Sequence, residues 1–235
     1  MTNAPIARRR PLAAVAVALV AMLAGLLLAL STTSHDHADA AEGHGHGQGA
    51  AALPTEAQVA FHDQMRKLWE DHVTWTRLAI VTFADGSAGF NATAGRLLQN
   101  QVDIGDAIKP FYGDAAGDQL TSLLHDHITI AVELLQAAKS GDTTAFNDAN
   151  TRWYANANDI GDFLASANPR YWPDDLMRSM MKTHLDQTLN EAADELGGKY
   201  ADSVTEYEAI HQHMLDMADL LSNGIIRTFP QRFHG

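Results

Sequence analysis

The side chains of this protein that are best suited to binding metals or exchanging protons are its histidines. The 235 residues contain 12 histidines and no cysteine. Thiolate catalysis, disulfide bonds and thiolate metal sites are therefore excluded. A neutral imidazole can bind a transition metal or exchange a proton near neutral pH. The positions of the histidines thus decide which chemistry is open to the chain.

Four histidines interrupt the apolar stripes of four predicted helices. Each lies three or four residues from apolar side chains, a spacing that places it on the same helix face as those side chains. Each is also near the middle of its helix, and neighbouring antiparallel helices have their mid-points side by side. We therefore expect four imidazoles to converge at one level of a helical core. They are His72, His127, His184 and His211.

Carboxylates are spaced to assist these histidines. Glu191 follows His184 by two helical turns on the same face, and Glu133 flanks the apolar stripe of its helix. Glu208 and His211 have the Glu-x-x-His spacing that places both side chains on one metal in ferritin-like bundles. Histidine and carboxylate ligands together suit Zn, Fe, Mn or Cu(II). The sequence therefore predicts a metal site in the core, with the metal's identity open.

Two other interpretations of the core remain open. The histidines could pair with neighbouring polar groups and form a structural hydrogen-bond network without metal. Alternatively, methionines near His184 and His211 could add thioether ligands and favour Cu(I), although methionines at helical spacing also serve as ordinary core packing. These methionines are Met177, Met180, Met181, Met214 and Met217.

A second group of histidines lies in a low-complexity segment at residues 32–53. The segment is rich in Gly, Ala and acidic residues and has too little apolar surface to fold alone. We predict a disordered linker that binds divalent metals loosely. Its candidate ligands are His35, His37, His44 and His46.

Residues 1–31 have the pattern of an export signal or a membrane anchor. Arg8, Arg9 and Arg10 precede a continuous apolar run at residues 12–30. The run exceeds the core of an ordinary signal peptide and is just long enough to span a bilayer. Cleavage and retention as an anchor both fit the pattern. Either outcome places the rest of the chain outside the cytoplasm, because the arginines stay inside.

The body of the chain, residues 54–235, has helical periodicity interrupted by Gly and Pro. Capping-box patterns begin at Thr55 and Ser203, and one helix is expected to end before Pro110. We predict an all-α fold, an antiparallel bundle of four long helices with one or two additional helices. The predicted helices cover about 55–83, 91–108, 114–139, 143–164, 174–196 and 202 to beyond 221.

Three sequence blocks in the body resemble a family of bacterial helical-bundle proteins with no assigned function. They are LWEDHVTWTR at residues 68–77, RWYANA at 152–157 and HLDQTLNE at 184–191. The resemblance implies a helical body. Some members of the family carry transferase or kinase names, but no strand followed by a Gly-rich phosphate loop is predicted here. The resemblance therefore adds no catalytic residue.

Charge and composition limit the function further. The net charge of −13 disfavours nucleic acid as a partner, because phosphate backbones would be repelled. We expect an extracytoplasmic, non-catalytic protein that binds a divalent metal or copper. A metalloenzyme with an Fe, Mn or Cu core and a metal-free structural or signalling ectodomain are the alternatives.

Overall fold

A computed structural model describes residues 53–234, and these residues form six helices of 23 to 29 residues and a short 3-10 turn. No strand occurs in this part of the chain, so the all-α prediction is confirmed. The helices are α2 (Glu56–Ala84), α3 (Phe90–Tyr112), α4 (Asp114–Ser140), α5 (Thr143–Ala167), α6 (Asp174–Leu196) and α7 (Tyr200–Thr228), followed by η1 (Pro230–Arg232).

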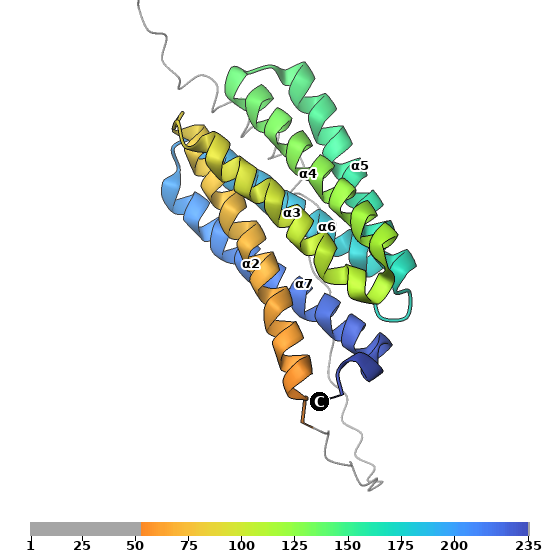
Figure 1. The fold of residues 1–235 in the computed structure, drawn as a ribbon. Coiled ribbons are helices and arrows are strands. Elements are labelled where there is room, and N and C mark those ends of the chain that lie inside the picture. Colours follow the sequence, from red (N-terminus) through yellow and green to blue (C-terminus); the bar gives the residue numbers. More distant parts are fainter. Residues whose placement is uncertain (1–52, 235) are drawn as a thin grey trace, which may run out of the picture.

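The helices are arranged as a closed antiparallel bundle (Figure 1). Each helix packs against the next one in the chain, and α7 packs back against α2. Helix α6 also contacts α2, across the bundle. The first and last parts of the described chain are joined where the hydroxyl of Thr55 donates to the carbonyl of Phe233 at 2.7 Å. Residues of α2, α4 and α6 lie in the same hydrophobic core.

Local sequence signals explain several helix ends. The predicted capping box at the start of α2 is present, because Thr55 and Gln58 each bond the backbone N–H of the other. Helix α5 is capped by Asp142, the residue before its first turn, whose carboxylate accepts from the N–H of Ala145. Helix α4 ends before Gly141, whose φ of 74° is the left-handed conformation that glycine adopts most easily.

Three details of the predicted fold were wrong. All six helices are long, so the division into four long helices and one or two extra ones does not hold. Helix α3 continues through Pro110, since the missing N–H removes one bond and Gly113 still donates to the carbonyl of Lys109. Ser203 caps no helix: it lies inside α7 and is fully buried.

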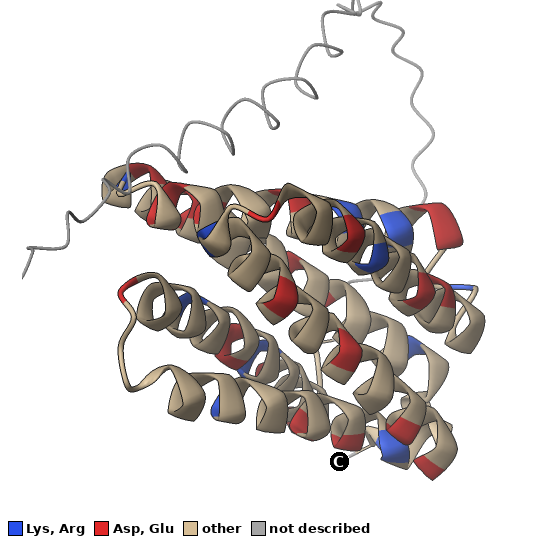
Figure 2. Ribbon diagram, turned by 90° about the horizontal axis from the view of Figure 1, so that it is seen from above, with Lys and Arg blue, Asp and Glu red and all other residues tan. Residues whose placement is uncertain are grey.

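Charged residues are spread along the helices, and acidic ones are in the majority (Figure 2). None of the helices between residues 53 and 234 has an apolar stretch long enough to cross a membrane. The predicted signal or anchor at residues 1–31 lies outside the described residues. So does the predicted linker, apart from Leu53, together with His35, His37, His44 and His46.

Candidate functional site

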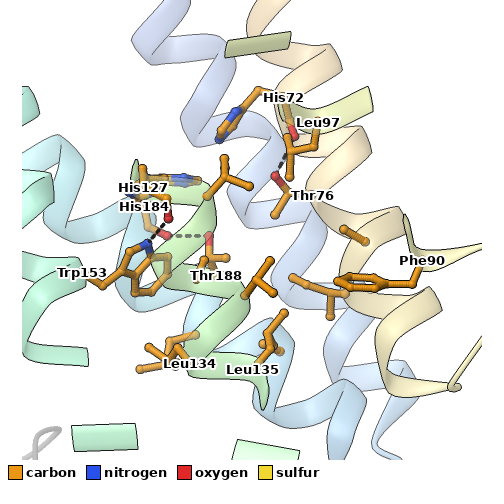
Figure 3. Close-up of a pocket in the computed structure, with 17 residues that line it drawn as sticks. His72, Thr76, Phe90, Leu97, His127, Leu134, Leu135, Trp153, His184 and Thr188 are labelled. Atoms are coloured by element: carbon orange, nitrogen blue, oxygen red, sulfur yellow. Dashed lines mark hydrogen bonds between the residues drawn. The ribbon is translucent and has the colours of Figure 1, made fainter. Parts of the chain in front are cut away.

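Three of the four predicted core histidines lie together in the bundle (Figure 3). His72 comes from α2, His127 from α4 and His184 from α6, and each is only 2–3% exposed. The ring centroid of His184 lies 5.7 Å from that of His72 and 6.0 Å from that of His127. Helices distant in the sequence therefore bring three imidazoles to one place.

The hydrogen bonds of His127 define its tautomer. Asn156 on α5 donates its amide nitrogen to the carbonyl of Leu123 at 3.0 Å, so its Oδ1 faces Nδ1 of His127 at 3.1 Å. Because Oδ1 can only accept, Nδ1 carries the proton and Nε2 keeps its lone pair. The indole of Trp153 stacks on the ring, with centroids 5.3 Å apart, and donates to the His127 carbonyl. The orientation of this imidazole is thus fixed by α5.

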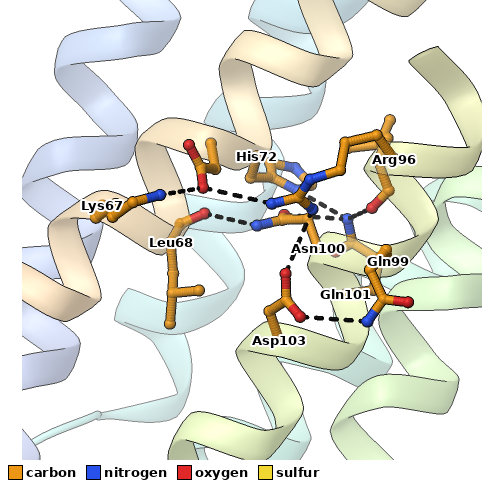
Figure 4. Close-up of polar contacts among 10 residues, drawn as sticks. Lys67, Leu68, His72, Arg96, Gln99, Asn100, Gln101 and Asp103 are labelled. Atoms are coloured by element: carbon orange, nitrogen blue, oxygen red, sulfur yellow. Dashed lines mark hydrogen bonds and ion pairs between the residues drawn. The ribbon is translucent and has the colours of Figure 1, made fainter. Parts of the chain in front are cut away.

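His72 has the opposite tautomer. The side-chain amide nitrogen of Gln101 donates to the carbonyl of Leu97 at 2.7 Å and to Nδ1 of His72 at 3.3 Å. Nδ1 therefore accepts, and the proton of the neutral ring is on Nε2. These contacts belong to a larger polar interface between α2 and α3 (Figure 4). The Oε1 atom of Gln101 is buried there without a partner among the described residues.

His184 contacts both of the other imidazoles. Its Nδ1 atom is buried and has no hydrogen-bond partner in the described part of the chain. Its own backbone carbonyl accepts from the hydroxyl of Thr188 at 2.8 Å. A buried nitrogen without a partner destabilises the fold unless a ligand, a water molecule or an ion satisfies it. Among the three histidines, His184 is therefore the one with a buried ring nitrogen that a bound species could satisfy.

Burial keeps all three imidazoles uncharged near neutral pH. It lowers the pKa of His72 from 6.5 to about 4, although Gln101 opposes the shift. The pKa of His127 falls to about 3, first through burial and then through the proximity of His72. Burial, followed by the other two histidines, holds the pKa of His184 well below 6.5. Neutral imidazoles are the form that binds metals.

A cavity of about 50 Å³ lies beside the three imidazoles. The histidines are grouped on one side of it, and Phe90, Leu134 and Leu135 line another side (Figure 3). A water molecule needs roughly 10–15 Å³ of such space. The cavity therefore has room for a metal ion or for a few atoms of a small ligand.

The prediction that His211 joins the core was wrong. Its Nε2 lies 3.1 Å from Oε1 of Glu70 at the surface, and Tyr207 stacks on its ring with centroids 5.9 Å apart. The buried line of α7 runs through Ile210 and Met214. His211 is one residue beyond Ile210, which turns it about 100° away from that line.

The predicted carboxylates do not join the histidines. Glu191 is buried as expected, but its carboxylate binds Arg77 at 2.9 Å. Burial raises the pKa of Glu191 to about 7, and Arg77 opposes this shift. Glu133 is exposed and pairs with Arg152, and Glu208 is exposed. Within residues 53–234, no three His, Asp or Glu side chains are grouped so that they could hold a metal ion.

None of the methionines between residues 53 and 234 lines the cavity beside the imidazoles. Met177, Met181, Met214 and Met217 are buried in the main apolar cluster, and none of them lines the cavity. The described structure therefore gives the thioethers a packing role.

Two polar residues of the site were missed as functional candidates. Asn156 and Gln101 are almost fully buried and hold His127 and His72. Each is a polar residue on an otherwise apolar helix stripe, which is the signal that could have identified it.

Comparison of the chain with known protein families, curated proteins and solved structures finds no match. The resemblance to a bacterial helical-bundle family stays a prediction.

Proposed function

We propose that the chain is an extracytoplasmic, non-catalytic metal-binding protein whose core site consists of His72, His127 and His184. One observation carries this proposal: three buried imidazoles from three helices adjoin one cavity, and a ring nitrogen of the central His184 has no partner among the described residues. Polar rings such as these three are rarely placed in a core without partners, and a metal ion would supply one.

The three imidazoles differ in how readily a ring nitrogen could bind a metal ion. Nε2 of His127 already has a free lone pair, because Asn156 occupies Nδ1. His72 would have to move its proton to Nδ1, and Gln101 would have to turn its amide and release the Leu97 carbonyl. We therefore propose His127 and His184 as the first two ligands and His72 as the third, recruited by a local rearrangement.

The two N-terminal segments account for the proposed location of the protein and for its loose metal binding. The Arg-flanked apolar run at residues 12–30 supports export or anchoring. His35, His37, His44 and His46 would collect metal loosely outside the cytoplasm. The core site would then hold one ion firmly in the folded body.

A metal-free polar core is the second candidate function for these histidines, within a structural or signalling ectodomain. It is favoured by the absence, in residues 53–234, of three side chains already grouped as metal ligands. The bond from Gln101 to His72 also suits a structural network, since it places a proton on the nitrogen that a metal would need.

Metal analysis of the full chain tests the proposal. We compare it with a chain in which His35, His37, His44 and His46 are alanine, and with the same chain carrying His184→Gln. The four alanines should remove loose binding and leave one ion per chain, which His184→Gln should release. The exposed His125 on α4 supplies the matched control, His125→Gln. If no ion remains after the tail substitutions, the metal-free core is correct.

A further inference from the structure

We infer that the cavity beside His127 and His184 holds a monovalent copper ion in preference to a divalent metal. This inference rests on the proposed metal-binding function and names the ion that the site selects. It is carried by the charge of the donor set, the number of ligands in place and the remaining walls of the cavity.

The ligands at the cavity are uncharged. Two buried carboxylates lie on α6 beyond His184, but Glu191 binds Arg77 at 2.9 Å and Glu195 accepts from Ser203 at 2.7 Å. Neither lines the cavity. An ion held by the imidazoles therefore keeps its full charge in a buried place. Because the desolvation cost rises with the square of the charge, a divalent ion costs about four times as much as a monovalent one.

The number of ligands in place favours a low coordination number. Within residues 53–234 no three His, Asp or Glu side chains are grouped as ligands of one metal. His127 and His184, whose ring centroids lie 6.0 Å apart, therefore offer two imidazoles without a third ligand already in place. Cu(I) accepts two or three ligands at wide angles, whereas Zn²⁺ in proteins is almost always tetrahedral.

The remaining walls give little support to water or hydroxide on a divalent ion. Phe90, Leu97 and Ile128 are among the apolar side chains that line the cavity. The two hydroxyl groups present, on Thr76 and Thr188, already donate to the carbonyls of His72 and His184. A divalent ion needs such ligands to complete its shell, but Cu(I) does not.

The test uses the full chain in a non-ionic detergent, with His35, His37, His44 and His46 replaced by alanine. Cu(I) affinity is measured anaerobically by competition with bicinchoninate, and Zn²⁺ affinity by competition with a chromogenic chelator. We expect one Cu(I) per chain and Zn²⁺ bound at least about 100-fold more weakly. His184→Gln should weaken Cu(I) binding by more than about 100-fold, since the loss of even an outer-shell partner costs 10–100-fold. His125→Gln should leave both affinities unchanged.

A second variant keeps the inference testable if His184→Gln does not fold. His184→Met offers a thioether, which binds Cu(I) but is a poor ligand for Zn²⁺, so Cu(I) binding should persist while Zn²⁺ binding disappears. Zn²⁺ binding that depends on His184 and is tighter than Cu(I) binding would overturn the copper inference and leave the metal-binding function intact. If neither ion binds in a way that depends on His184, both proposals are wrong.

Discussion

The imidazole of His127 is held by Asn156, which accepts from its Nδ1–H at 3.1 Å and is itself anchored to the Leu123 carbonyl. This relationship couples α4 to α5 and leaves Nε2 of His127 with a lone pair. Metal-binding histidines in other proteins are commonly fixed by such a partner on the second nitrogen. The same bond also satisfies two buried polar groups, so it serves the fold whether or not metal binds.

Replacing Asn156 with alanine should therefore affect stability and binding together. The variant loses the acceptor for a buried N–H, which costs about 1–3 kcal/mol of unfolding free energy. Metal affinity should fall by about 10–100-fold, because the His127 tautomer is no longer fixed. Urea unfolding and metal competition measure the two effects. Asn147→Ala, at an exposed position of the same helix, is the control; an equal loss there would show that the effect is not specific to His127.

His184 and His127 should respond oppositely to replacement by phenylalanine in the absence of metal. His184→Phe removes a buried nitrogen without a partner among the described residues, and the adjoining cavity can take the larger ring. Its stability should stay within about 1 kcal/mol of the parent or rise. His127→Phe leaves the Oδ1 of Asn156 without its donor and should cost about 1–3 kcal/mol. Thermal unfolding of the two metal-free variants measures their stabilities. Similar losses of stability in both would contradict this prediction.

The helix pattern of the sequence was sufficient to find three of the buried histidines but not their surroundings. His72, His127 and His184 lie on apolar stripes whose three- and four-residue steps are unambiguous. In α7 two neighbouring lines of residues are both apolar. The sequence pattern predicts the line through Tyr207 and His211 as the buried one, whereas the structure buries the line through Ile210. The two lines differ by a rotation of one residue and contain similar numbers of apolar side chains.

Partners that are distant in the sequence could not be predicted from it. Glu191 was correctly expected to be buried, but Arg77, which binds it, is 114 residues away on another helix. The pattern of one helix shows which face is buried and not which side chain lies opposite. For the same reason Asn156 and Gln101 were visible only as polar residues on apolar stripes, with no sign that they bind His127 and His72.

Acid should destabilise the metal-free body before its surface carboxylates are protonated. In the unfolded chain these imidazoles bind protons near pH 6.5, whereas in the folded chain the pKa is about 4 for His72 and about 3 for His127. Protons therefore favour the unfolded state as the pH falls below 6.5. Each of these histidines should remove about 2 kcal/mol between pH 6.5 and pH 5. Urea unfolding across this range measures the slope, and His72→Gln should reduce it; a flat profile would contradict the burial of neutral imidazoles.

Glu191, whose carboxylate binds Arg77, should show the opposite dependence on pH. Glu191 and Glu195 are both buried, and Arg77 lies 2.9 Å and 3.4 Å from their carboxylate oxygens. Because the folded pKa of Glu191 is raised to about 7, the stability linked to its protonation is present at low pH and is lost as the pH rises through 7.

Arg77→Gln should make this loss much larger, because two buried carboxylates then face each other without a cation. Removing one partner of a buried ion pair costs about 3–5 kcal/mol, and we expect that cost at pH 8. At pH 5.5 it should be smaller, since protonation of Glu191 removes the uncompensated charge. Arg152→Gln, which breaks the exposed pair with Glu133, should change stability little at either pH. Urea unfolding at both pH values measures the difference; an Arg77→Gln loss that is the same at pH 5.5 and pH 8 would show that Glu191 does not titrate in the folded chain.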